Sequence, residues 1–330
     1  MSVFVWPPNC LPQSIDWWYD SPSRPAISPF DGDTTIISRT GDRWKGGCSF
    51  NPIFGEQRWE LQAFLGRLRH QNNQFVMPPQ FYQRRGTLVS VNLAPNNGRF
   101  ETIGPWTGVS AAIEIDSNML RITNSGATTG SAQSGAFTVV ANTQYVFRVE
   151  CLKGLTSGFS VRVGTSAGGS QIFTSGSLTQ DGLYTTTFNS GANTTLHATL
   201  FCNTAVSGDF VYYDNLLIEP CALTQGAQSI GDLLTIDGLT ASQSQMLRKS
   251  DLIEVNNQLL MLMTSLTTNA SGVASVRVSP PTRAIIADNS PVIVGTPQGR
   301  FLMADEPAKW STTGFFSSSF NLSIMEDLTT

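Results

Sequence analysis

One segment of the chain has the hydrophobic period of an amphipathic helix. Between Gly55 and Asn72 the apolar residues recur every three or four positions, and the charged residues fall mostly on the other side. The apolar stripe consists of Leu61, Phe64, Leu65 and Leu68. Asn72-Asn73 ends this pattern, and a short strand at Phe75–Met77 is stopped by two prolines. The sequence predicts one helix here and no other of comparable quality.

The middle of the chain alternates apolar and polar residues in short runs. In the run that starts at Phe159, the side chains of Phe159, Val161 and Val163 point one way. In the run that starts at Leu196, the residues Leu196, Ala198 and Leu200 make the apolar face. Gly, Asn, Ser and Asp separate the runs, which are 139–149, 159–163, 183–188, 196–201 and 210–218. Short strands at about ten-residue spacing predict a β-sandwich over residues 93–221.

The flanking pieces, 1–92 and 222–330, also have strand patterns. The clearest is a hairpin in which Leu252–Val255 and Leu259–Met263 flank Asn256-Asn257, the residue type that a tight turn favours. A second hairpin is expected from 262–267 and 273–278, with Pro280-Pro281 as its end. Further strands are expected at 34–38, 44–50, 292–295, 300–303 and 315–324.

Neither flanking piece supplies enough apolar residues for a core of its own. Together they contain about two hundred residues, which is the size of one domain. We therefore expect a mainly β protein with a discontinuous domain, 1–92 and 222–330, built as a split β-sandwich or β-barrel with one amphipathic helix. A second β-sandwich of the jelly-roll type, 93–221, is inserted into it.

Charged residues make up only 13% of the 330-residue chain, and the formal net charge is -4. Such a composition gives no basic stripe for nucleic-acid phosphates, so nucleic-acid binding is not expected. No run approaches the ~20 apolar residues that span a bilayer, so membrane insertion is not expected either. The N-terminus lacks the basic and apolar stretches of an export signal, which predicts a soluble product made in the cytoplasm.

The five cysteines show no metal-binding spacing. Cys10, Cys48, Cys151, Cys202 and Cys221 are scattered and odd in number, a pattern typical of small buried apolar residues in a reducing compartment. A bridge between Cys151 and Cys202, or between Cys10 and Cys48, is the alternative.

Catalytic motifs are absent from the sequence. There is no nucleophile elbow, phosphate-binding glycine loop or HExxH motif. The carboxylate pairs Asp31/Asp33 and Glu326/Asp327 are expected to form turns or a solvated terminus rather than an acid–base pair. We therefore expect a protein that is not an enzyme and needs no cofactor.

Aromatic residues give the best candidates for binding. Trp106, Tyr184, Tyr212 and Tyr213 lie in the middle segment, where aromatic faces of a β-sandwich can stack on sugars; packing in the core is the alternative for each. Trp17, Trp18 and Tyr19, together with Trp6, form a second group that belongs either to a core or to a subunit interface.

Two residues of the middle segment are candidates for a metal. The oxygens of Asp214 and Asn215 are of the type that ligates calcium at the edge of a sandwich. A turn or a hydrogen bond at the end of a strand is an equally good interpretation of this pair.

The middle segment resembles the jelly-roll carbohydrate-binding modules that are appended to glycoside hydrolases. The resemblance covers some 125 residues in the family's motif order: 92–97, 104–106, 119–124, 140–147 and 211–219. It implies the jelly-roll fold and either glycan binding or service as a structural spacer.

The flanking pieces resemble distal-tail-type proteins of long-tailed bacteriophages. The residues that carry this resemblance are 28–32, 43–44, 62–69, 74–78, 252–255, 279–283 and 299–303. The resemblance implies a ring, usually a hexamer, at the tip of the virion tail. Its neighbours would be the tail tube protein and baseplate hub or tail-fibre proteins, and the inserted domain would face host-surface polysaccharide. The alternative is a carbohydrate-binding accessory protein that is not part of a virion.

Overall fold

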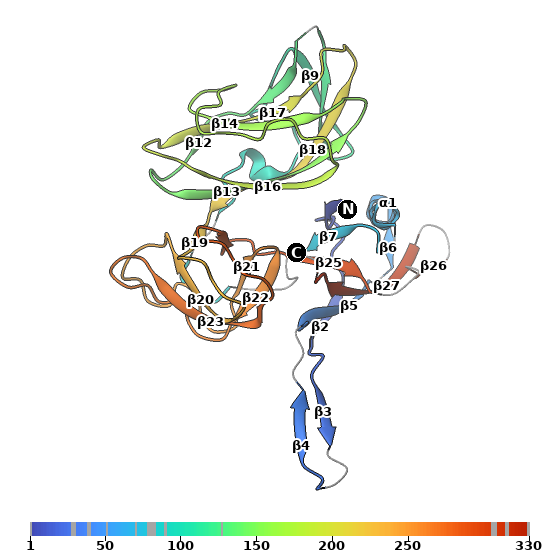
Figure 1. The fold of residues 1–330 in the computed structure, drawn as a ribbon. Helices are drawn as coiled ribbons and strands as arrows, with labels where there is room; N and C mark the ends of the chain where they lie inside the picture. Colours follow the sequence, from blue (N-terminus) through green and yellow to red (C-terminus); the bar gives the residue numbers. More distant parts are fainter. Residues whose placement is uncertain are drawn as a thin grey trace. The chain divides into compact units, whose positions relative to one another are not determined.

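A computed structural model describes residues 2–27, 31–37, 41–50, 52–69, 71–77, 84–88, 91–126, 128–304, 309–313 and 317–328. The chain divides into two compact units. The first contains Trp6–Leu88 and Leu223–Thr330, and the second contains Ser2–Val5 and Val89–Ala222 (Figure 1). Strand β1 (Val3–Val5) thus belongs to the second unit, where the Val5 amide donates to Glu150 Oε1 at 3.4 Å. The fold is mainly β, as the sequence predicts.

The first unit contains a sheet formed by strands from both ends of the chain. Its strands lie in the order β7-β25-β27-β5-β2, and two further strands, β6 and β26, pair with β27. Their bounds are β2 Ser14–Asp20, β5 Arg43–Ser49, β6 Ile53–Phe54, β7 Gln74–Met77, β25 Gly299–Met303, β26 Lys309–Thr313 and β27 Ser317–Glu326. Because β25 and β27 lie between β7 and β5, neither end of the chain can form this sheet alone.

Helix α1 (Gly55–Leu68) packs its apolar stripe into the core of this unit, as the periodicity predicts. The buried residues of the helix are Leu61, Phe64, Leu65 and Leu68. The helix ends four residues earlier than expected because Arg69 takes a left-handed conformation with φ 46°. The side chain of Asn73 then donates to the Arg67 carbonyl at 2.8 Å, which satisfies one free group of the last turn.

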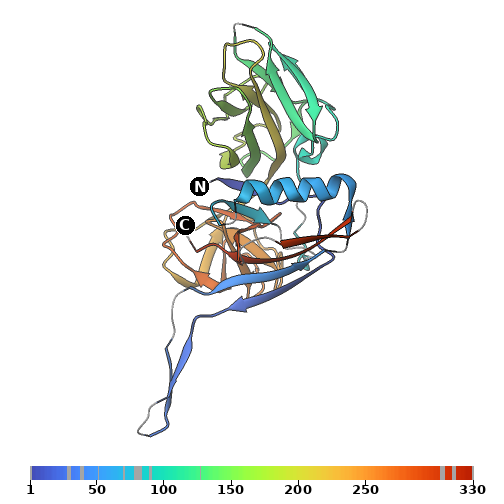
Figure 2. The same ribbon diagram turned by 90° about the vertical axis from the view of Figure 1, so that its right-hand side faces the viewer.

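A hairpin of its own extends from the β2–β5 pair. Strands β3 (Arg24–Ile27) and β4 (Thr34–Ile37) pair with each other as a separate two-stranded sheet, and Figures 1 and 2 show it pointing away from the rest of the unit. We call this hairpin the arm. Residues 28–30, the first part of the tail-protein-like segment 28–32, lie outside the described residues.

The rest of the first unit is a closed barrel with the strand order β19-β20-β23-β22-β21-β24. Its strands are β19 Ala222–Thr224, β20 Gly231–Asp237, β21 Leu252–Val255, β22 Gln258–Leu262, β23 Ala274–Thr282 and β24 Pro291–Ile293. The first predicted hairpin is confirmed, since Asn256 and Asn257 form its turn at φ 49° and 61°. Two details of the second were wrong. Strand β22 ends at Leu262, and β23 continues through both prolines to Thr282.

The second unit is a sandwich of two antiparallel sheets. The five-stranded sheet has the order β16-β13-β18-β10-β9, and the six-stranded sheet has the order β15-β14-β17-β11-β8 with β12 beside β17. A short 3₁₀ helix, η1 (Pro95–Gly98), lies near the start of the unit. The strands are β8 Thr107–Val109, β9 Ala111–Asp116, β10 Met119–Asn124, β11 Gly130–Gln133, β12 Phe137–Thr138, β13 Gln144–Lys153, β14 Phe159–Gly164, β15 Phe173–Thr174, β16 Gly182–Asn189, β17 Thr195–Cys202 and β18 Phe210–Pro220.

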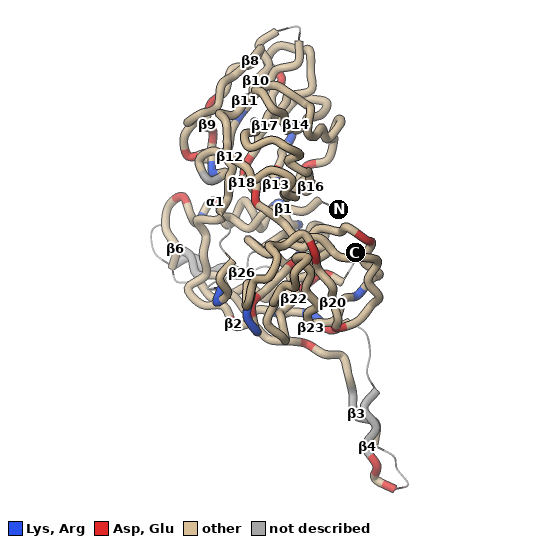
Figure 3. Tube along the Cα trace, turned by 90° about the vertical axis from the view of Figure 1, so that its left-hand side faces the viewer, with Lys and Arg blue, Asp and Glu red and all other residues tan. Residues whose placement is uncertain are grey.

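The core of the second unit follows the predicted alternation. Val161, Val163, Leu196, Ala198 and Leu200 are all fully buried between the sheets. The expected strand 139–149 starts instead at position 144, because a residue with positive φ at position 142 turns the chain before it. Figure 3 shows that charged residues are sparse along the chain.

Candidate functional site

The outer edge of β2 is an open edge of the first unit. Strand β2 pairs with β5 from Ser14↔Ser49 to Asp20↔Arg43. In the described part of the chain no strand pairs with its other side. An edge strand of seven residues presents a row of unpaired backbone groups, the usual template for pairing with another chain. We call β2 and its exposed side chains the edge surface.

The arm follows this edge along the chain as a separate two-stranded sheet. Beyond Asp20↔Arg43 the same two chain segments pair again as β3 and β4, from Arg24↔Ile37 to Ile27↔Thr34. Ile27 is 68% exposed, and Ala26 is exposed beside it. An isolated two-stranded hairpin is marginally stable in water. The edge surface and the arm therefore each have an open side without a partner within the described residues.

The structure separates the four aromatic candidates for a subunit interface. Trp18 and Tyr19 are exposed on β2, and the Trp18 ring lies over Gly47. Trp17 is half-buried with its ring 5.5 Å from that of Phe301. The interpretation of Trp6 as an interface residue was wrong.

Trp6 is only 2% exposed and belongs to the core of the first unit. Its ring lies 5.4 Å from that of Phe64 and 5.6 Å from that of Phe75, and its Nε1 donates to the Cys10 carbonyl at 2.9 Å. A side chain held in this way has no face left for a neighbouring subunit.

Two of the four sugar-stacking candidates were also wrong, because their rings are in the core of the sandwich. Trp106 is 4% exposed and packs against Phe100 at 5.7 Å. Tyr213 is fully buried, and its hydroxyl donates to the Phe201 carbonyl at 2.6 Å. Burial raises the pKa of this phenol well above its ordinary value.

The other two aromatic candidates are half-buried. Tyr184 packs against the core of the sandwich, and burial raises its pKa. Tyr212 lies on the opposite face of the five-stranded sheet, where its hydroxyl donates to Asp116 Oδ2 at 2.9 Å. The four candidates therefore do not converge on one site.

Asp214 and Asn215 form an irregularity of β18. Asn215 has φ 51°, and the pairing of β13 with β18 shifts register at this point. The Asn215 side-chain amide donates to Glu150 Oε2 at 2.9 Å and to Asp214 Oδ2 at 3.2 Å. These are hydrogen bonds of the kind that the alternative interpretation expects, and the calcium interpretation stays a prediction.

No metal-binding cluster of three or more His, Cys, Asp or Glu residues is found among the residues that the structure describes. In the same part of the chain, no helix is both long and apolar enough to cross a membrane. All five cysteines are buried and free, which is the predicted pattern rather than the alternative bridges.

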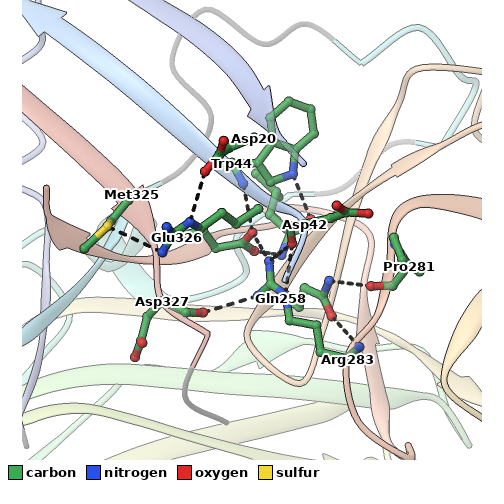
Figure 4. A network of polar contacts seen from close by, with 11 residues as sticks. Asp20, Asp42, Trp44, Gln258, Pro281, Arg283, Met325, Glu326 and Asp327 are labelled. Carbon is green, nitrogen blue, oxygen red and sulfur yellow. Dashed lines mark hydrogen bonds and ion pairs between the residues drawn. The ribbon is translucent and has the colours of Figure 1, made fainter. Parts of the chain in front are cut away.

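Sequence reasoning missed a polar junction between the sheet and the barrel of the first unit (Figure 4). Arg283, which follows β23, donates to the Glu326 carboxylate and to the carbonyls of Asp42 and Asp327. Glu326 also accepts hydrogen bonds from the amides of Trp44, at 3.2 Å, and Leu259, at 3.1 Å. The expectation that Glu326 belongs to a solvated terminus was wrong, since its side chain is completely buried.

Burial raises the pKa of the Glu326 carboxyl, and the Arg283 guanidinium opposes that rise. The guanidinium offsets the cost of burying the carboxylate, and the carboxylate offsets the cost of burying the guanidinium. Nothing in the local sequence around position 326 indicated this role, because the partners lie 43 and 282 residues away.

Comparison with known proteins adds little to this geometry. No family model and no curated protein matches the chain. Among solved structures, one described as "CBM4 structure and function" is similar with a TM-score of 0.32 and 13% identity, over 38% of this chain and 99% of that one. The adhesin domain of Epf from Streptococcus pyogenes is similar with a TM-score of 0.26 and 14% identity, over 62% of this chain and 79% of that one. The likeness to a carbohydrate-binding module is thus weak.

Proposed function

We propose that this protein is a structural protein that assembles with copies of itself through the edge surface and the arm. The observation that carries the proposal is the open edge of β2, with the two-stranded arm next to it along the chain and Ile27 exposed on that arm. Both parts gain stability when another chain covers them.

Within the first unit, the barrel does not compete with the edge surface as a site of strand pairing. The barrel is closed, so its strands offer no free edge. The edge surface and the arm are different surfaces, and a contact that joins one to the other in the next copy is head-to-tail. Repetition of a head-to-tail contact gives a ring when the rotation closes.

In its finer form, the proposal is a ring at the tail tip of a long-tailed bacteriophage, assembled from copies made in the host cytoplasm. The resemblance of the flanking segments to distal-tail-type proteins supports this form. The ring, a hexamer, would join the tail tube to baseplate hub or tail-fibre proteins. The second unit would contact host-surface polysaccharide.

The test is the oligomeric state of two matched variants. Trp18 is exposed on β2 and Trp59 is exposed on α1, at 46% and 60%. We expect light scattering after size-exclusion chromatography to give a closed oligomer for the unmodified protein and for Trp59→Arg. We expect Trp18→Arg to be a monomer with an unchanged melting temperature.

A clean monomer of the unmodified protein at high concentration would overturn assembly and favour the carbohydrate-binding accessory protein. Equal disruption by both substitutions would place the contact elsewhere than the edge surface. Negative-stain images of the oligomer then decide its form, because a ring shows closed rotational symmetry whereas an open filament does not.

A further inference from the structure

Charge is distributed unequally between the two sheets of the second unit. The strands of the five-stranded sheet carry all the carboxylates found in strands of the sandwich: Glu114, Asp116, Glu150, Asp214 and Glu219. The strands of the six-stranded sheet, all of them described, carry no Asp or Glu. Their basic residues are Arg162 on β14 and His197 on β17. The loop 165–172 beside them is uncharged.

Two arginines of this unit stack on phenylalanine rings, and only one of them has a carboxylate partner among the described residues. Arg121 Cζ lies 4.3 Å from the centre of the Phe210 ring, and Arg121 Nη1 pairs with Glu114 Oε1 at 2.8 Å. Arg162 Cζ lies 4.2 Å from the centre of the Phe201 ring. Among the described residues no hydrogen bond or ion pair of the Arg162 side chain is seen, and its Nε is buried without a partner. The side chain is half-buried, so an external anion would have to pair with its two terminal nitrogens.

The neighbours of Arg162 across the sheet are neutral hydrogen-bonding residues. The register aligns Arg162 with Thr174 and Thr199, Thr199 with Gln133, and Gln133 with Thr107. The adjacent cross-strand row consists of Val161, Leu200 and Ala132, which are in the core. Because neighbouring residues of a strand point to opposite faces, the row that contains Arg162 lies on the outer face. At the usual strand spacing the row is about 19 Å long.

The loop after β14 folds over the middle of this row. The Gly168 amide donates to Thr199 Oγ1 at 3.2 Å, and Thr199 is fully buried. A side chain at Gly168 would come within 2.9 Å of Gln133 Nε2, so the loop approaches this face closely. The loop leaves Arg162 and Gln133 only partly covered. His197 lies beyond it, opposite Gly164, with its Nδ1 3.2 Å from the Ser134 carbonyl.

We propose that this face, which we call the Arg162 face, binds an acidic saccharide. The planar guanidinium of Arg162 donates to the carboxylate of a uronic acid residue, which matches its fork of donors. Gln133, His197 and the hydroxyls of Thr107 and Thr174 are suited to the hydroxyl groups of the flanking sugars. The proposal rests on the part of the proposed function that gives the second unit a saccharide ligand, and it does not depend on assembly.

The charge on this face favours an acidic saccharide over other classes of ligand. A nucleic acid presents a phosphate at every nucleotide and is held by several cations, whereas this face offers one arginine. A divalent cation would need the carboxylates that these strands lack. A neutral saccharide would leave the guanidinium without a partner in the complex, at the cost of desolvating it.

The test is titration calorimetry of the full chain with tetragalacturonate and with its fully methyl-esterified form, which keeps the rings and removes the charge. We expect binding of the acid that weakens at high salt, and binding of the ester at least tenfold weaker. Arg162→Gln should weaken binding of the acid at least tenfold. Arg162→Lys, which keeps the charge without the fork, should bind with intermediate affinity.

Arg121→Gln is the matched control, because it removes the other arginine–phenylalanine stack. It should bind within twofold of the unmodified protein, and a melting curve of each variant shows whether the sandwich is intact. Unchanged binding by Arg162→Gln, equal binding of acid and ester, or absence of binding to the acid would overturn the proposal. Equal affinity for poly-glutamate would assign the face to acidic peptides instead. Light scattering on the same samples reports assembly separately, so failure of the ring does not count against this site.

Discussion

The buried junction between Arg283 and Glu326 gives the sharpest test of how the first unit is held together. In Arg283→Met the Glu326 carboxylate keeps its hydrogen bonds from the amides of Trp44 and Leu259. It loses Arg283, the one cation that pairs with it among the described residues. The carbonyls of Asp42 and Asp327 lose a donor as well. The arginine is 13% exposed and the glutamate not at all, so water does not replace the guanidinium fully.

Removal of one partner of a buried ion pair costs about 3–5 kcal/mol. The amides of Trp44 and Leu259 report this loss directly, because both donate to Glu326. Hydrogen exchange measured by mass spectrometry should therefore speed up at least about 100-fold in the peptides that contain them, at roughly 1.4 kcal/mol per factor of ten.

The matched control is Arg277→Met on β23. Arg277 pairs with Asp232, but both side chains are more than half exposed. Such a pair contributes less than about 1 kcal/mol, so exchange near Trp44 should stay within a few-fold of the unmodified protein. If Arg283→Met exchanges no faster than this control, the junction does not stabilise the unit and the reasoning is refuted.

The loss should also depend on pH. Burial raises the pKa of Glu326, and removal of Arg283 takes away the charge that opposes this rise. A carboxyl whose folded pKa lies above its unfolded value of about 4.3 stabilises the fold in its protonated form. That contribution is complete below the unfolded pKa and is lost as pH rises through the folded pKa. The difference between Arg283→Met and the unmodified protein should therefore be larger at pH 8 than at pH 5.

Two further predictions concern the core. Leu61→Ala on the buried face of α1 should lower the free energy of unfolding of the first unit by about 2–5 kcal/mol, whereas Gln62→Ala should change it by less than about 0.5 kcal/mol; urea unfolding followed by tryptophan fluorescence measures both, and similar losses would contradict the helix orientation. Burial raises the pKa of the Cys48 thiol from 9.0 to about 12, so native protein should resist labelling by a thiol reagent at pH 8 and react fully in denaturant. Because the folded pKa is the higher one, the contribution of Cys48 to stability should fall as pH rises from about 9 to about 12.

The elements that were predicted well are those whose signal is local. The stripe of α1 follows from residues within two turns of each other, and the turn at Asn256-Asn257 follows from two adjacent residues. The alternation around Val161 fixes the inward face of β14 in the same way. Each depends on backbone geometry that neighbouring residues determine, so distant partners do not change it.

The candidate site was predicted less well because side-chain type does not determine burial. Trp106 and Tyr213 were candidates either for sugar stacking or for core packing, and the sandwich uses both to fill its core, where a large ring buries the most apolar surface. Glu326 looked like part of a solvated terminus, and only the position of β27 between β25 and β5 places it against the barrel. Strand order across a sheet brings together residues that are far apart in sequence. The hydrophobic periodicity of a single segment does not predict that order.

The Arg162 face depends on strand order in the same way. The sequence alone shows that Arg162 alternates outward from Val161 and Val163. It does not show that every strand carboxylate of the unit is on the other sheet. Packed sheets lie about 10 Å apart, which is well beyond the ~4 Å of an ion pair. On the five-stranded sheet, Glu114 pairs with Arg121 and Asp116 accepts a hydrogen bond from Tyr212, so these carboxylates are not direct partners of the Arg162 guanidinium. Arg162 is the only Lys, Arg, Asp or Glu in the strands of the six-stranded sheet, all of which are described, so an acidic group of a ligand meets no carboxylate from these strands.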